Sequence, residues 1–132
     1  MISSAQDQVL GYRLVIPDHR LIIVPFDAAE QAHYLCAMLN SGPSRYLVQT
    51  YVVGTQISTH VLEHLRISRF DPANPIHHQL AAFSQQAHEA TTARDTARVR
   101  EIEAEIDRLA AELWGLTEEE LREIQESLEE LR

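Results

Sequence analysis

The sequence of 132 residues predicts an α+β fold that is mostly helical, and three observations support this prediction. Two short β-like runs before residue 25 predict an N-terminal β-hairpin. Apolar residues recur at helical spacing from residue 27 onward. Near the C-terminus their spacing becomes 3-4-3-4, which is typical of a coiled-coil-like seam. We therefore expect a small α+β subdomain over residues 1–72, in which the hairpin and a short strand pack with helices, followed by a helical hairpin over residues 73–132.

The hairpin strands are residues 9–16 and 21–24, because each run ends at a proline and the turn between them is rich in polar residues. A helix is then expected to begin at Asp27, since Glu30 stands three residues later in the capping-box arrangement. Residues 40–42 end this helix, and Pro43 suits the first turn of a second one.

Gly54 opens a polar loop, and Leu65, Ile67 and Phe70 indicate a short strand after it. Asn74 is a suitable N-cap for a helix whose first residue is Pro75 and which runs to about residue 90. A helix from about 96 to 114 follows.

The last two helices are expected to pair as a hairpin. Gly115 ends the first of them, and Thr117 with Glu120 forms a capping box at the start of the second. Each helix must bury its apolar stripe against its neighbour, against the preceding helix, or against another copy of the chain. The stripe residues predicted for a domain or oligomer interface are Val99, Ile102, Ile106, Leu109, Leu113, Leu121, Ile124 and Leu128.

The net charge of −9 is concentrated at one end of the chain. Residues 101–132 hold twelve acids and three arginines, so the first hundred residues are balanced. The acidic stretch is interpreted as a solvated helical surface, with a specific acidic docking face as the alternative. No apolar run approaches the roughly 18–20 residues that cross a bilayer, and the first residues do not form a signal peptide. We expect a cytoplasmic protein without a membrane partner.

The sequence shows no complete catalytic or metal-binding constellation. Cys36 is the single cysteine and stands among apolar residues of a predicted helix, which favours a buried, inert thiol. His60 and His64 are four residues apart, but they lack the third ligand that a zinc site needs. There is no lysine in the chain and therefore no phosphate-binding loop of the Walker type. We expect no metal and no catalytic residue in this chain.

A region of residues 45–69 combines arginines with hydroxyl and amide side chains. Arginines suit phosphates and guanine, and glutamine can contact base edges. The alternative is that the arginines are ordinary solvated side chains. The residues that we expect to face DNA or a partner domain are Arg45, Gln56, Ser58, Thr59, Arg66 and Arg69.

Three strings occur in an order that resembles a known protein region. They are YLCAMLNSGPSRYLVQTY (34–51), VGTQISTHVLEHLRISRFDPANPIHHQLAAFSQQAH (53–88) and IDRLAAELWGLTEEELREI (106–124). Together they resemble the C-terminal target-recognition region of adenine-N6 DNA methyltransferases from type II restriction-modification systems and, more distantly, half of a type I specificity subunit. Trp114 stands where that region usually has tyrosine.

The resemblance implies a recognition role for the first subdomain and no catalysis by this chain. Its partners would be DNA and a methyltransferase catalytic domain or subunit, which binds S-adenosylmethionine and flips the adenine. No cofactor is expected in this chain itself, which resembles a recognition fragment or a split subunit. The competing hypothesis is a helical oligomerisation or protein-interaction module without DNA binding, in which the C-terminal helices form a homo-oligomer.

Overall fold

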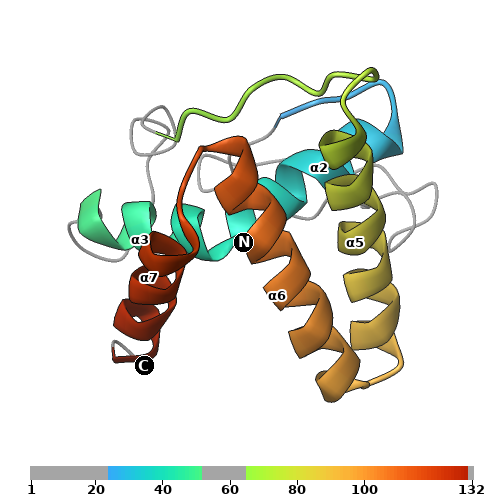
Figure 1. The fold of residues 1–132 in the computed structure, drawn as a ribbon. Coiled ribbons are helices and arrows are strands. Elements are labelled where there is room, and N and C mark those ends of the chain that lie inside the picture. Colours follow the sequence, from blue (N-terminus) through green and yellow to red (C-terminus); the bar gives the residue numbers. More distant parts are fainter. Residues whose placement is uncertain (1–23, 52–64, 131–132) are drawn as a thin grey trace.

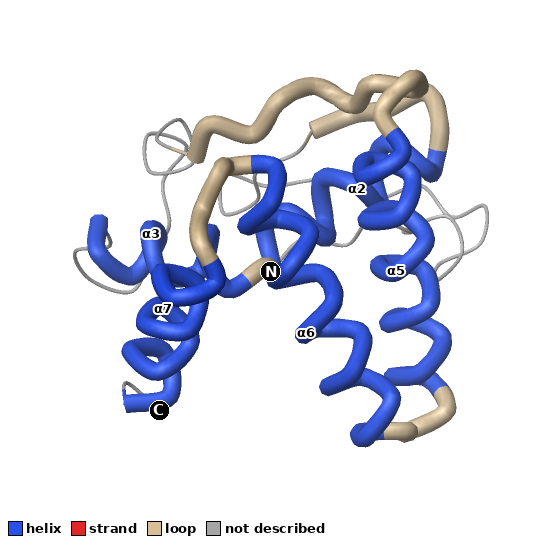
Figure 2. Tube along the Cα trace, viewed as in Figure 1, coloured by secondary structure: helices blue, strands red, loops and turns tan. Residues whose placement is uncertain are grey.

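A computed structural model describes residues 24–51 and 65–130 of the chain. This part is 75% helical and contains no strand, so the predicted α+β class is wrong and the described fold is helical (Figures 1 and 2). The helices, labelled as in Figure 1, are α2 (Ala29–Asn40), α3 (Gly42–Tyr51), α5 (Pro75–Thr92), α6 (Thr96–Leu113) and α7 (Glu118–Glu130).

The two expected β elements have different outcomes. The hairpin of residues 9–24 lies outside the described residues, apart from the coil at Val24. The expected strand at residues 65–70 is described, and it is an extended segment without strand pairing, drawn as a tan coil in Figure 2. Its backbone is held by side chains of the surrounding helices instead of by a neighbouring strand.

The main core lies where α2, α5 and α6 pack together. Met38, Leu80, Ile102 and Leu109 are its largest fully buried apolar side chains. A smaller cluster of Leu39, Val48 and Leu65 joins α2 and α3 to the extended segment. The extended segment is therefore fixed by apolar burial as well as by hydrogen bonds.

Several helix ends match the local sequence signals. Asn74 accepts from the Ile76 amide at 2.9 Å and caps α5, as predicted. Thr117 and Glu120 form the predicted reciprocal capping box, with bonds of 2.8 and 3.2 Å. Gly115 adopts a φ of 69° after α6, a conformation that favours glycine.

The predicted start at Asp27 is wrong. Helix α2 begins at Ala29 after Ala28, which has no side-chain cap. The Glu30 carboxylate, which the capping box would require, contacts the His78 ring on α5 instead. A contact between distant parts of the chain has replaced the local cap.

The pairing of the last helices also differs from the expected hairpin. Helices α5 and α6 lie side by side, whereas α7 packs chiefly against α3 (Figure 1). One carboxylate ties this arrangement together, because Asp107 on α6 accepts from the Gly42 amide of α3 at 2.7 Å and from Gln125 of α7 at 3.1 Å. None of the described helices is long and apolar enough to cross a membrane.

Candidate nucleic-acid interface

Residues 65–71 form an extended stretch that we call the arginine segment, and three helices hold its backbone. At its start, the Trp114 indole N–H donates to the Arg66 carbonyl at 3.0 Å. In its middle, the Tyr34 hydroxyl on α2 donates to the Ser68 carbonyl at 3.0 Å. At its end, the Asp71 amide donates to Nδ1 of His77 on α5 at 2.9 Å. The segment is thus attached along its whole length, although its residues form no strand.

Apolar side chains of the arginine segment face the helices. Leu65 is buried, and Ile67 and Phe70 pack against the main core. The Phe70 ring meets the Tyr34 ring edge-on, with centroids 5.6 Å apart. Such aromatic pairs add to the stabilisation from buried area. These contacts leave the polar residues of the segment on the outside.

Arg66 and Arg69 are both exposed, and neither forms an ion pair with any acid in the described part of the chain. Arg98 and Arg108 on α6 differ, because each pairs with a glutamate of the same helix. An unpaired guanidinium on a fixed backbone offers its five N–H donors to an incoming anion. The guanidinium fork matches a phosphate or a carboxylate group.

Arg45 occupies a different environment. It is half-buried on α3 and lines a pocket of about 690 Å³ bounded by α2, α3, α5, α6 and α7. Arg100 and the acids Glu103, Asp107 and Glu129 line the same pocket, whereas Arg66 and Arg69 do not. The structure therefore does not gather the three predicted arginines into one patch.

The remaining predicted contact residues, Gln56, Ser58 and Thr59, lie outside the described residues, as do His60 and His64. Cys36 is buried and lines the pocket, and the Asn40 amide approaches its sulfur at 3.4 Å. The described residues include no group of three side chains suited to hold a metal ion.

The predicted interface stripe lies largely inside one chain. Ile102, Ile106 and Leu109 belong to the main core, and Val99 and Leu113 pack against it. On α7, Leu128 is buried, while Leu121 and Ile124 are half-buried. An oligomer built on these residues stays a prediction.

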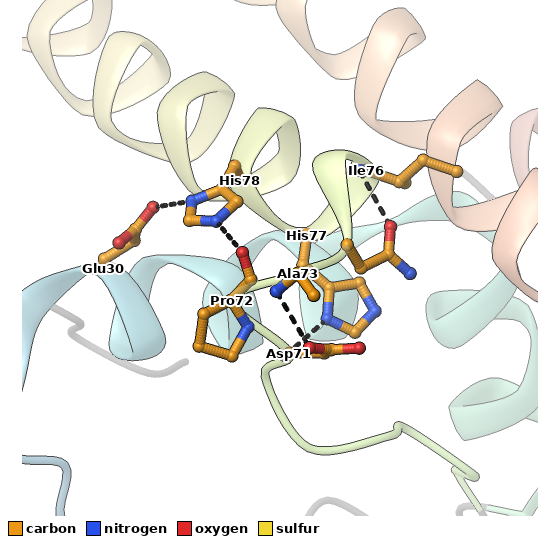
Figure 3. A network of polar contacts seen from close by, with 8 residues as sticks. Glu30, Asp71, Pro72, Ala73, Ile76, His77 and His78 are labelled. Atoms are coloured by element: carbon orange, nitrogen blue, oxygen red, sulfur yellow. Dashed lines mark hydrogen bonds and ion pairs between the residues drawn. The ribbon is translucent and has the colours of Figure 1, made fainter.

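Two adjacent histidines hold the turn between the arginine segment and α5 (Figure 3). The buried His77 ring stacks on the Tyr34 ring, with centroids 4.4 Å apart, and burial lowers the pKa of His77. His78 lies between the Pro72 carbonyl and the Glu30 carboxylate, and these two hydrogen bonds raise its pKa. Burial also raises the pKa of Tyr34, which keeps its hydroxyl protonated as a donor to Ser68.

Sequence reasoning missed the three anchors of the arginine segment, Trp114, Tyr34 and His77. Trp114 was conspicuous as the single tryptophan of the chain, at the end of a predicted helix, but its partner lies 48 residues away. A buried tryptophan or tyrosine usually finds a partner for its polar atom, and that rule is the signal available from sequence.

The comparisons identify no relative: no family model, curated protein or solved structure matches this chain.

Proposed function

We propose that this chain is a non-catalytic DNA-positioning module of a restriction-modification adenine-N6 DNA methyltransferase. It would act in the cytoplasm together with a catalytic domain or subunit that binds S-adenosylmethionine. The observation that supports DNA contact is the arginine segment. Its residues Arg66 and Arg69 are exposed and form no ion pair within the described part of the chain. Its backbone accepts hydrogen bonds from Tyr34 and Trp114 and donates one to His77. The assignment to a methyltransferase rests on the resemblance of the three sequence strings.

The proposed contact is with the phosphate backbone. Exposed arginines that meet phosphates fix the position of a protein on the duplex without reading its sequence. Holding the backbone in place reduces the ordering cost of binding, because only the arginine side chains must become fixed. Base recognition would then belong to other residues, among which Gln56, Ser58 and Thr59 remain the predicted ones.

Fluorescence anisotropy with a labelled duplex at low salt tests this proposal. Arg66→Ala/Arg69→Ala should weaken binding about tenfold or more. The plot of log affinity against log salt concentration should become less steep by the amount that roughly two phosphate contacts contribute. Arg98→Ala/Arg108→Ala is the matched control, since it removes the same charge from α6. If both double variants bind DNA with equal affinity, net charge alone governs binding. If the wild-type protein binds no duplex, with or without a methyltransferase partner, the proposal is refuted.

The second candidate function is the helical oligomerisation module. The observation in its favour is that Leu121 and Ile124 of α7 remain half-exposed beside the buried Leu128. Sedimentation velocity separates the two candidates. A dimer that persists at high salt and has no DNA affinity favours this second function, whereas a monomer that binds DNA favours the first.

A further inference from the structure

The hydrogen bond at the end of the arginine segment requires a neutral histidine. Nδ1 of His77 accepts from the Asp71 amide at 2.9 Å, and a ring nitrogen can accept only while it carries no proton. His77 as a residue is only 3% exposed and its ring stacks on Tyr34, so water cannot easily replace the lost acceptor. Protonation of His77 would therefore place two donors against each other and break this anchor.

The neighbouring contact requires a charged histidine. One ring nitrogen of His78 meets the Glu30 carboxylate, and the other meets the Pro72 carbonyl at 2.7 Å (Figure 3). Both partners are acceptors, and a neutral imidazole has only one N–H to donate. Both contacts can be hydrogen bonds only when His78 is an imidazolium ion.

We propose that His77 and His78 form a two-sided pH clamp, which holds the Asp71–Pro72 turn fully only while His77 is neutral and His78 is charged. Acid opens the clamp at His77, and alkali opens it at His78. The clamp regulates the segment that presents Arg66 and Arg69, and this consequence for DNA rests on the proposed function. The clamp itself is a property of the turn and needs no DNA.

The surrounding charges agree with these two protonation states. Burial is the largest influence on His77 and lowers its pKa below the ordinary value of 6.5; the positive charge of His78 acts in the same direction, and Asp71 opposes both. The Tyr34 hydroxyl on α2 is neutral, and Phe70 adds no charge. For His78, the Pro72 carbonyl is the largest influence, and the Glu30 carboxylate and Asp71 also raise its pKa above 6.5.

The direction of each pH effect follows from these shifts. The contribution of His77 to stability is complete above pH 6.5 and declines as the pH falls toward its lower folded-state pKa. The contribution of His78 is complete below pH 6.5 and is lost as the pH rises through its higher folded-state pKa. The turn is therefore held best near pH 6.5 and less well on both sides of it.

Amide hydrogen exchange measured by NMR tests the clamp without DNA. The reporters are the Asp71 amide and the Ala73 amide, which donates to the Asp71 carboxylate at 2.9 Å. Their protection factors, corrected for intrinsic exchange, should be greatest near pH 6.5 and fall about fivefold or more at about pH 5. The fall at about pH 8.5 should be smaller, about twofold, because the contact between His78 and Glu30 is exposed to solvent. Equal protection at all three pH values, with the helices intact, would overturn the proposal.

Two variants separate the two sides of the clamp. His77→Asn places an amide oxygen near the position of Nδ1, so protection should persist in acid while the decline in alkali remains. His78→Gln should lower protection at pH 6.5 and remove the decline in alkali, because glutamine does not titrate. His88→Gln, on the same helix but outside the turn, is the control and should keep both declines. A His77→Asn protein that still loses protection in acid would exclude His77 as the acid-sensitive group.

The DNA measurement distinguishes failure of the clamp from failure of the proposed function. If both declines in protection occur but Arg66→Ala/Arg69→Ala binds DNA like the wild type, the clamp stands and the DNA function falls. If protection is independent of pH while that double variant loses DNA affinity, the DNA function stands and the clamp falls.

Discussion

Removing the Asp107 carboxylate should loosen the junction of α3, α6 and α7. Its two oxygens accept from the Gly42 amide at 2.7 Å and from Gln125 at 3.1 Å. Hydrogen bonds to charged groups contribute about 1.5–3 kcal/mol each when buried. Asp107 is half-buried, so water replaces part of this stabilisation, and we expect Asp107→Ala to cost about 2 kcal/mol in total. The melting temperature should fall by roughly 3–5 °C per kcal/mol in a chain of this size.

Urea denaturation followed by helical circular dichroism measures the free energy of unfolding. Glu105→Ala is the matched control, because it also removes one acid from α6 and breaks only the exposed bridge to Arg108. Exposed pairs of this kind contribute about 0–0.5 kcal/mol. If the Asp107 and Glu105 variants lose the same stability, the carboxylate does not join the three helices as described.

A second substitution at the same junction sharpens this test. A Cβ atom at Gly42 would lie 2.9 Å from the Asp107 carboxylate oxygen, which is too close. Gly42→Ala should therefore destabilise the wild type but cost much less in the Asp107→Ala background. Additive effects of the two substitutions would show that they do not share a contact.

Three further substitutions test separate parts of the fold. Leu80→Ala should cost about 2–5 kcal/mol, because it leaves a cavity in the core, and a urea midpoint within experimental error of the wild type would contradict this. Thr117→Ala should lower stability by about 0.5–2 kcal/mol through loss of the cap that it shares with Glu120, and thermal melts of the variant and wild type should differ accordingly. Trp114→Phe keeps an aromatic side chain but removes the N–H that donates to the Arg66 carbonyl, so amide exchange should quicken over residues 66–68 and not in α5.

The sequence predicted helices well where side chains close to an end satisfy that end. Asn74 and Thr117 cap α5 and α7 with their own side chains, so a local pattern is sufficient. Asp27 had the same pattern, but the Glu30 carboxylate binds His78, which is 48 residues away. A sequence pattern within a few residues cannot show that the capping side chain contacts a residue far along the chain instead.

The segment at residues 65–71 is a second case in which the sequence does not identify a distant hydrogen-bond partner. Leu65, Ile67 and Phe70 are buried or pack against the two apolar clusters, but the strand predicted from them is wrong. A strand needs a neighbouring backbone, whereas here a tryptophan, a tyrosine and a histidine supply the hydrogen bonds. Periodicity reports burial, but it does not identify the partners of the backbone groups.

The three arginines that the sequence analysis grouped together have different surroundings in the structure. Arg45 is half-buried and lines a pocket of mixed charge, together with Arg100 and three acids, so it does not present its guanidinium on an open surface. Arg66 and Arg69 are exposed residues of one segment, and the acid closest to them in sequence, Asp71, accepts a hydrogen bond from Ala73. If this chain positions DNA, affinity should therefore depend on the pair and much less on Arg45, even though all three stand in one stretch of sequence.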